Sequence, residues 1–287
     1  MEDLKDKVAV ITGGASGIGK AMAEKFAAEG MKLVLADVEQ KALDGVVESF
    51  KANGVDVIGV CTDVSKEADV QNLSAETKKA FGTAHLVCNN AGVGAAGISW
   101  QLSQADWEWV LGVDLWGVIY GVRHFMPLLL DNGGQGHIVN TASMAGLVSG
   151  PGMAPYNVAK HGVVTLSECL YMEIQALGAP IGVSVLCPGW VNTRINESDR
   201  NRPGGAVSDD ELDPLGKALK AHIAQALPAG LTAEFVAALV LDAVKDNQFY
   251  ILPHQHWKGL IRHRMEGILH KKQPGVMEPP EDSGAMA

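Results

Sequence analysis

The strongest constraint on the fold is a short apolar run that passes directly into a glycine-rich turn near the start of the chain. Residues 7–12 (KVAVIT) have the composition of a buried strand, and residues 13–19 (GGASGIG) supply the turn. The residues after the turn place several alanines and Phe26 at helical spacing. Glycines let the backbone approach a pyrophosphate closely, and free N–H groups at the start of a helix favour its charge. This strand, turn and helix therefore predict a dinucleotide site at the edge of an α/β sheet.

A second buried strand is predicted at residues 31–36 (MKLVLA), and it ends at Asp37. Asp37 lies 18 residues after Gly19, close to the spacing of about 20 residues at which an acidic side chain accepts hydrogen bonds from the adenosine ribose. A carboxylate there would repel a 2′-phosphate, and neither Ser16 nor Val38 offers a cation to bind one. The pattern predicts NAD as the cofactor in preference to NADP. The alternative is that Asp37 merely caps the next helix.

Strands and helices alternate along the rest of the chain. Runs typical of strands occur at residues 55–61, 84–88, 138–142, 181–187 and 249–252, and helical patterns at residues 66–80, 103–130, 156–177, 236–244 and 257–269. Such alternation predicts a parallel sheet covered by helices on both faces, and 287 residues fit one large domain. Two polar turns, Asp63-Val64 and residues 89–92 (NNAG), should lie at the carboxyl edge, where such sheets bind ligands. Each turn alone could be a simple chain reversal.

A hydroxyl, a phenol and an amine lie at useful spacing in the middle of the chain. Tyr156 and Lys160 are four residues apart, so a helix opened by Pro155 would place both side chains on one face. The Lys160 ammonium would then stabilise a phenolate and lower the pKa of Tyr156 from about 10, as a general acid/base requires. Ser143 follows an apolar strand and could donate a hydrogen bond to a substrate oxygen. Taken alone, the pair of Tyr156 and Lys160 could also be an accident of a helical surface.

Charge and composition exclude several classes of function. The net charge is −10 and the pI about 5.3, which disfavours nucleic acid and anionic membranes as main partners. No apolar run approaches the roughly 18 residues needed to span a bilayer, and the first residues lack the features of a signal peptide, so we expect a cytoplasmic protein. His254 and His256 lack an evident third ligand, so no metal site is predicted. The cysteines form no CxxC pair and are expected to be reduced core residues: Cys61, Cys88, Cys169 and Cys187.

Together these motifs resemble those of the short-chain dehydrogenases/reductases, in their single-domain form, from about residue 7 to residue 252. The resemblance rests on residues 12–19 (TGGASGIG), Asp63-Val64, residues 89–92, Ser143, residues 156–160 (YNVAK) and residues 187–193 (CPGWVNT). It implies a Rossmann-like, doubly wound parallel sheet of about seven strands, flanked by helices, and a nicotinamide cofactor. It also implies that Tyr156 donates and accepts the proton, that Lys160 holds the nicotinamide ribose, and that Ser143 positions the substrate carbonyl.

The resemblance also implies a set of site residues. The expected catalytic residues are Asp114, Ser143, Tyr156 and Lys160. The expected cofactor-binding residues include Tyr156 and Lys160 again, together with Gly13, Ser16, Gly17, Ile18, Gly19, Asp37, Asp63, Val64, Asn90, Ala91, Gly92, Pro188, Gly189, Val191 and Thr193.

Two residues depart from the family pattern. His85 stands where the family often has Asp, at a position that serves the fold. Asp114 stands where the family usually has Asn, which shapes a helix kink and anchors a water connected to the active-site lysine. Asp114 also points along the apolar stripe of its predicted helix, where an ionised carboxylate is costly unless it is paired. Lys160 is the expected partner of Asp114, through a water molecule. Alternatively, the family uses mainly the backbone carbonyl at this position, and Asn and Asp are then interchangeable.

Further expectations concern surfaces and segments. The predicted helix at residues 103–130 has a second apolar face at Val110, Val113 and Tyr120, which predicts a homodimer or homotetramer unless the chain itself covers that face. Residues of about 190–230 are expected to form a mobile substrate loop with a lid helix at 215–227, or alternatively a surface insertion. We expect a single domain over residues 1–272 and a loose tail over residues 273–287.

The sequence thus predicts an NAD-dependent oxidoreductase that interconverts a secondary alcohol and a ketone by hydride transfer, with Tyr156 as general acid/base. A bulky apolar or aromatic substrate is expected, because four large side chains lie in or beside segments that border the substrate cleft in the resembled fold: Trp100, Met144, Met153 and Trp190. The alternative from another class is a dinucleotide-binding regulator that keeps the fold without turnover.

Overall fold

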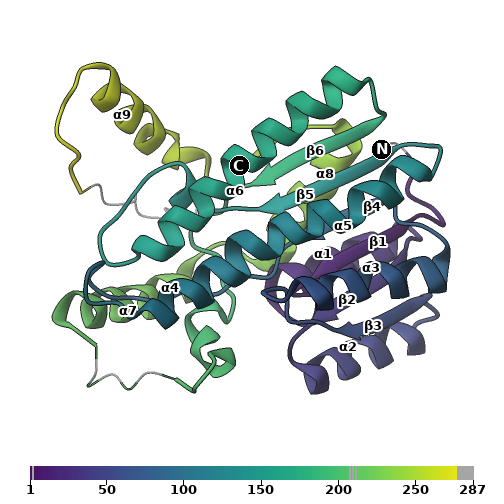
Figure 1. Cartoon of the computed structure of the whole chain (residues 1–287), viewed down its shortest axis with the longest axis horizontal. Coiled ribbons are helices and arrows are strands. Elements are labelled where there is room, and N and C mark those ends of the chain that lie inside the picture. Colours follow the sequence, from purple (N-terminus) through teal and green to yellow (C-terminus); the bar gives the residue numbers. More distant parts are fainter. Residues whose placement is uncertain (2, 207, 209, 211, 277–287) are drawn as a thin grey trace.

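The computed structural model has one seven-stranded sheet with helices on both faces (Figure 1). It describes residue 1, residues 3–206, residues 208 and 210, and residues 212–276. The strands lie in the order β3-β2-β1-β4-β5-β6-β7, and all neighbouring pairs are parallel. The Rossmann-like fold class expected from the sequence is confirmed. The strands are β1 (Val8–Thr12), β2 (Lys32–Asp37), β3 (Val57–Cys61), β4 (Leu86–Asn89), β5 (Gly136–Thr141), β6 (Ile181–Leu186) and β7 (Tyr250–Ile251).

The helices that cover the sheet form two layers. Buried side chains of α1, α2 and α8 pack on one face, and those of α3, α5 and α6 pack on the other. Helices α4, α7 and α9 lie beyond one end of the strands (Figure 1). Among the described residues the α-helices are α1 (Gly17–Ala28), α2 (Gln40–Ala52), α3 (Glu67–Phe81), α4 (Gln104–Leu111), α5 (Gly117–Asp131), α6 (Ala154–Leu177), α7 (Pro214–Ala226), α8 (Ala233–Asp246) and α9 (Lys258–Leu269).

The central strand β1 shows how burial on both faces shapes the sequence. Ala9 and Ile11 belong to the core cluster that includes α1 and α8, while Val8 and Val10 belong to the cluster that includes α5 and α6. Because successive side chains of a strand point to opposite faces, a strand covered on both sides reads as a continuous apolar run. β1 pairs with both β2 and β4, so the order of the strands reverses at this point. Ligands bind in such folds at the carboxyl end of the strands where the order reverses.

The helix predicted over residues 103–130 is interrupted. It consists of α4, a π-helical turn η1 at Gly112–Trp116, and α5. The turn inserts an extra residue into the helical repeat, and Asp114 within it is 0% exposed. Gly117 follows the turn, and a β-carbon on Gly117 would lie 2.9 Å from the side chain of Val64. The kinked helix therefore packs closely on the turn after β3.

The cysteines differ in part from the expectation. All four are free, and Cys88 and Cys187 are buried as predicted. Cys61 and Cys169 are exposed, so the prediction that they belong to the core was wrong. Cys61 ends β3, which is an edge strand of the sheet, and Cys169 lies on the outer side of α6.

The segment predicted as a substrate loop and lid contains three helical elements in its described residues, the last of them a short 3-10 helix, η5, at Leu227–Ala229. A 3-10 helix, η3, spans Ile195–Asn201, and α7 follows it. Asp213 caps α7 by accepting hydrogen bonds from the N–H groups of Leu215 and Gly216, and its second carboxylate oxygen accepts one from the N–H of Ile98. The predicted helix is therefore present and is tied to the loop after β4. Its action as a lid stays a prediction.

The end of the described chain stands apart from the body. Helix α9 projects outward, and none of its residues is buried (Figure 1). The predicted tail is described as far as Val276, and residues 277–287 lie outside the described residues. Among the described residues, no helix combines the length and apolar character needed to cross a membrane.

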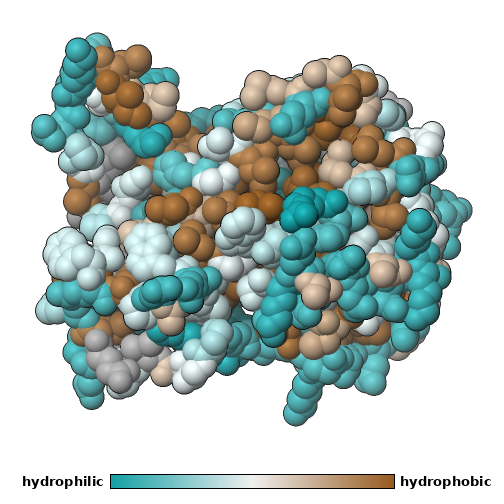
Figure 2. All heavy atoms as spheres, in the orientation of Figure 1, coloured by the Kyte–Doolittle hydropathy of each residue, from teal (hydrophilic) through white to brown (hydrophobic). Residues whose placement is uncertain are grey.

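The apolar surface on the α5 and α6 side differs from the predicted one. Val110 is fully buried within the chain, whereas Val113 and Tyr120 are only partly buried against core clusters, so the chain covers part of this face. Figure 2 shows hydrophobic residues gathered over α5 and α6, with hydrophilic residues over α2 and α3. Exposed apolar residues on this side are Trp116, Leu130, Val158, Met172 and Leu177.

The close approach of α5 to β4 gives a test of the fold. A β-carbon on Gly121 would lie 1.9 Å from Oδ1 of Asn89, whose buried amide donates to Asn140. We expect Gly121→Ala to destabilise the protein by about 1–3 kcal/mol, because either the helix or this hydrogen bond must move. Gly45→Ala is the matched control, since no atom lies within 4 Å of a β-carbon on this glycine of α2. Thermal unfolding should show a lower Tm for Gly121→Ala alone, and equal Tm values would contradict the packing.

Candidate active site

Ser143, Tyr156 and Lys160 meet at the carboxyl end of β5. Ser143 follows that strand, and Tyr156 and Lys160 lie one turn apart on α6, which has Pro155 in its first turn. The ammonium Nζ of Lys160 lies 5.4 Å from the centroid of the Tyr156 ring, and it donates a hydrogen bond of 3.1 Å to the carbonyl of Thr141. The structure therefore brings together the three side chains that the sequence singled out.

Asp114 completes the cluster by direct contact. Its Oδ2 lies 3.2 Å from Nζ of Lys160, and the two side chains are 0% and 3% exposed. Its Oδ1 accepts a hydrogen bond of 2.8 Å from the N–H of Val93, in the loop after β4. The sequence predicted a link through water, whereas the structure has an ion pair. A carboxylate this deeply buried needs such a partner to stay charged.

Burial and charge act in opposite directions on the pKa values of this cluster. Burial raises the pKa of Asp114, against the effects of Lys160 and of the Val93 N–H. Burial acts to lower the pKa of Lys160, but the negative charges of Asp114 and of an ionised Tyr156 outweigh it, so the pKa of Lys160 is raised. The pKa of Tyr156 is raised by burial, lowered by Lys160 and raised again by Asp114, with a net increase. The sequence predicted a lowered pKa for Tyr156; the direction is opposite because burial and Asp114 together outweigh Lys160.

Two glycines of the turn after β1, Gly13 and Gly19, lie where a side chain would meet other atoms of the chain. A β-carbon on Gly19 would lie 2.1 Å from the carbonyl oxygen of Gly13, and one on Gly13 would lie 3.0 Å from Cα of Ala91. Gly13 and Gly17 also have positive φ angles of 64° and 51°, which other residues rarely adopt. The turn thus presents bare backbone at the start of α1, with the shape and free N–H groups that a pyrophosphate requires.

Asp37 links the glycine turn to the start of α2. Its Oδ2 accepts a hydrogen bond of 3.1 Å from the N–H of Ala15, and its Oδ1 accepts one of 3.0 Å from the N–H of Glu39. Burial raises the pKa of Asp37, and these hydrogen bonds act against the increase. The N-cap position of α2 is held by Glu39, whose side chain makes no cap hydrogen bond, so Asp37 is not the helix N-cap that the alternative proposed. It lies at the edge of the sheet where a ribose would follow the pyrophosphate.

Other expected cofactor residues, in the turns after β3 and β4, lie at the same carboxyl edge of the sheet and are held there by different hydrogen bonds. The hydroxyl of Thr12 accepts hydrogen bonds from the N–H groups of Asn90 and Ala91, at 2.9 Å and 3.1 Å. Asp63 turns toward its own loop, where Ser65 donates to it, and its neighbour Val64 is buried. The carboxylate of Asp63 is therefore engaged within the turn after β3.

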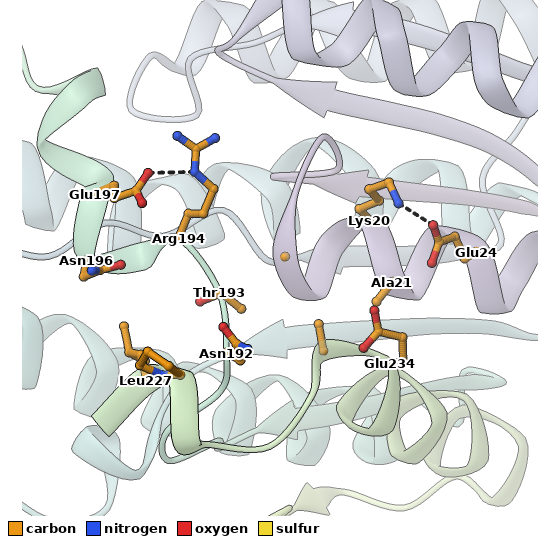
Figure 3. Close-up of a pocket in the computed structure, with 13 residues that line it drawn as sticks. Lys20, Ala21, Glu24, Asn192, Thr193, Arg194, Asn196, Glu197, Leu227 and Glu234 are labelled. Atoms are coloured by element: carbon orange, nitrogen blue, oxygen red, sulfur yellow. Dashed lines mark hydrogen bonds and ion pairs between the residues drawn. The ribbon is translucent and has the colours of Figure 1, made fainter. Parts of the chain in front are cut away.

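A cavity of about 430 Å³ opens beside the glycine turn. Figure 3 shows it between α1, the loop after β6 and the start of α8, with the ion pairs Lys20–Glu24 and Arg194–Glu197 on opposite sides. Its lining includes Gly17 and Thr193 but does not reach Tyr156. The cavity is thus the outer rim of the predicted pyrophosphate site and not the place of catalysis.

Comparison with known proteins decides the family. Residues 7–204 match the family model for short chain dehydrogenases. The chain belongs to this family. A CLA biosynthesis dehydrogenase/reductase from Lactiplantibacillus plantarum is 34% identical, covering 96% of this chain and 98% of the relative. A C alpha-dehydrogenase from Sphingobium sp. is 31% identical, covering 97% of this chain and 90% of the relative.

A solved structure extends the likeness to the whole fold. A short chain dehydrogenase/reductase from Burkholderia phymatum, in complex with NAD, is 44% identical with a TM-score of 0.94, and the match covers 98% of this chain and 100% of that chain. This short chain dehydrogenase is therefore a member of a family of oxidoreductases, as the sequence predicted.

His254 is a site residue whose role the sequence did not reveal. Its Nδ1 accepts a hydrogen bond from the N–H of Gly189 and its Nε2 donates one to the carbonyl of Trp190, each at 3.0 Å. A carbonyl can only accept, so Nε2 carries the proton. His254 thus clamps the Pro188 to Thr193 loop of this short chain dehydrogenase. No sequence spacing indicates a contact between residues 64 and 65 positions apart.

The Asp114 and Lys160 pair gives a test at the chemical centre of this short chain dehydrogenase. We expect Asp114→Asn to move the pH at which alcohol oxidation reaches half its maximum to lower pH, because Asp114 raises the pKa of Tyr156 and oxidation needs the phenolate. Asp114→Ala should instead lose about 3–5 kcal/mol of stability, because Lys160 is left unpaired. Steady-state rates against pH and thermal unfolding measure both. If the profile of Asp114→Asn superimposes on that of the parent, the backbone alone acts at this position.

Proposed function

We propose that this short chain dehydrogenase uses NAD to interconvert a secondary alcohol and a ketone. The observation that carries the proposal is the meeting of Ser143, Tyr156 and Lys160 at the edge of the sheet that also holds the bare glycine turn. No group of three potential metal ligands occurs among the described residues, and the proposed proton transfer uses Tyr156.

The proposed mechanism divides the work among three side chains. Tyr156 takes the hydroxyl proton when an alcohol is oxidised and returns it when a ketone is reduced. Lys160 carries a fixed positive charge that favours the phenolate form of Tyr156. Ser143 would donate a hydrogen bond to the substrate oxygen, which is negative in the transition state. The nicotinamide ring, when bound, accepts or supplies the hydride.

The residues present fit a dinucleotide. The turn of Gly13, Gly17 and Gly19 would hold the pyrophosphate, with Ser16 and Ile18 in the same turn and Thr193 packed beside Gly17. Asp37 would accept from the ribose hydroxyls. The nicotinamide end would rest among Gly92, Lys160, Pro188, Gly189 and Val191, and the adenine end near Asp63 and Val64.

The substrate proposal is a bulky apolar or aromatic alcohol. Trp100 is 83% exposed, and Met153 pairs through its backbone with Gly97 in the same loop region. Met144 is buried and Trp190 packs on Trp257. We therefore propose that these two side chains support the wall of the cleft and contact the substrate little. Helix α7 would close over the substrate, since Leu215 and Leu219 approach Gly152.

Three further proposals concern the whole molecule. Exposed apolar residues on the α5 and α6 side, such as Trp116 at the end of η1 and Met172 on α6, support a homodimer or homotetramer in which a second copy covers them. A cytoplasmic location follows from the sequence prediction. We place the domain at residues 1–272.

Tyr156→Phe tests the mechanism. We expect turnover to fall by about 100-fold to 10,000-fold, because the transferable proton is lost while the ring stays. Binding of NADH, followed by its fluorescence, should persist, since Phe keeps the shape of the site. Tyr171→Phe is the matched control, because Tyr171 packs on Phe249 away from Lys160. Turnover retained by Tyr156→Phe would refute the assignment, and loss of turnover in both variants would indicate a general loss of structure.

The cofactor preference follows from Asp37. NADH should bind at least about tenfold more tightly than NADPH, because a 2′-phosphate would lie beside the carboxylate. Asp37→Asn should narrow this preference, whereas Asp44→Asn on the exposed side of α2 should leave it unchanged. Dissociation constants for both cofactors measure the effect. Equal affinity of the parent for NADH and NADPH would show that Asp37 does not discriminate between them.

A further inference from the structure

Residues 193–202, here named the strap, cross the carboxyl edge of the sheet. At its start, Thr193 lies against the glycine turn after β1, because a β-carbon on Gly17 would come within 3.2 Å of the Thr193 methyl group. At its middle, the buried hydroxyl of Ser198 accepts a hydrogen bond of 3.1 Å from the N–H of Gly94, in the loop after β4. The strap therefore touches the ends of β1 and β4, between which the dinucleotide is proposed to bind.

Two residues near the end of the strap, Arg200 and Asn201, hold it at the end of β2. The Arg200 guanidinium donates two hydrogen bonds to Oε1 of Glu39, at 2.9 Å and 2.6 Å, and the Asn201 amide donates a third at 3.1 Å. A third nitrogen of Arg200 donates to the carbonyls of Arg194 and Glu197, so the guanidinium also holds η3 together. The Arg200 guanidinium keeps the pKa of Glu39 below its usual range, so Glu39 is charged at neutral pH.

Glu39 lies beside Asp37, so its contact with the strap is close to the proposed cofactor site. Glu39 lies two residues after Asp37, and its N–H donates to the Asp37 carboxylate. The Glu39 carboxylate makes no cap hydrogen bond to α2, and within the described part of the chain it accepts its side-chain hydrogen bonds from Arg200 and Asn201 of the strap. The ion pair thus joins the strap to the place where the adenosine ribose is proposed to bind.

The other side of the strap is held separately. Arg202 forms an ion pair with Asp106 in α4 and lies over the ring of Trp109. These contacts and that of Ser198 lie on the β4 side of the cleft, whereas Arg200 and Asn201 reach the β2 side. Separation of Arg200 and Asn201 from Glu39 would therefore open the strap at the adenosine end while its other anchors stay in place.

We propose that Arg200 and Glu39 form a latch that holds the strap over the adenosine end of the bound cofactor and sets how fast the cofactor leaves. This rests on the proposed function, since it takes NAD as the ligand of the cleft. The strap spans the edge from the glycine turn to Glu39, so a dinucleotide beneath it is released when the latch opens. The two side chains are 27% and 29% exposed, so the latch is accessible to salt and can open without unfolding of the core.

The test measures dissociation of NADH in a stopped-flow experiment, with excess NAD as the displacing ligand and NADH fluorescence as the signal. Glu39→Ala removes the acceptor and Arg200→Gln removes the charged donor. Each should raise the dissociation rate constant about threefold to tenfold, as expected when a half-buried, multiply hydrogen-bonded ion pair is lost. The double variant should dissociate no faster than the faster single variant, because the partners act as one unit.

Lys245→Gln is the matched control. Lys245 pairs with Glu29 at 2.8 Å, and these side chains are 33% and 34% exposed, but the pair joins α8 to α1 away from the strap. Its dissociation rate constant should equal that of the parent. High salt should speed dissociation from the parent and from this control, but not from the two latch variants, because the screened interaction is already absent in them.

The outcomes separate the latch from the proposed function. If the parent binds NADH and both latch variants release it at the parental rate, the latch is overturned and the proposed cofactor stands. Effects of the two substitutions that add fully in the double variant would also overturn it, since the residues would then act independently. Failure of the parent to bind NADH would overturn the proposed cofactor and the latch together.

Discussion

The rest of the site depends on the interactions that stabilise the buried ammonium of Lys160. A lysine that is 2% exposed keeps its proton only if negative groups surround it. Asp114 supplies a charge at 3.2 Å, and the carbonyl of Thr141 supplies a hydrogen bond at 3.1 Å. These partners come from the π-helical turn and from the end of β5, so both the helix kink and the sheet register are needed to hold Lys160 beside Tyr156.

In the proposed mechanism, Asp114 would affect the two directions of the reaction unequally. Its negative charge secures the proton on Lys160 and at the same time raises the pKa of Tyr156. A protonated phenol is the form that donates to a ketone, whereas oxidation of an alcohol requires the phenolate. In the proposed mechanism, the charge of Asp114, which keeps Lys160 ionised, would therefore set a higher pH for oxidation than an amide would.

Local patterns predicted the features that depend on local sequence. The apolar strands, the glycine turn and the one-turn spacing of Tyr156 and Lys160 each follow from neighbouring residues. The sheet has the expected form, and Tyr156 and Lys160 lie together as expected. The contact of Arg200 with Glu39 joins residues 161 positions apart, and no pattern in either segment indicates it. The exposure of Cys61 likewise depends on β3 being an edge strand, which an apolar run alone does not reveal.

The two ends of the cleft are held by ion pairs of different character. At the catalytic end, Asp114 and Lys160 are almost fully buried, so salt screens them little and loss of either leaves a costly unpaired charge. At the adenosine end, Arg200 and Glu39 are partly exposed, where an ion pair contributes little stability and opens readily. Chemistry needs atoms fixed within fractions of an ångström, whereas cofactor exchange needs a segment that opens and closes. If both proposals hold, the difference in burial between the two pairs would supply both within one cleft.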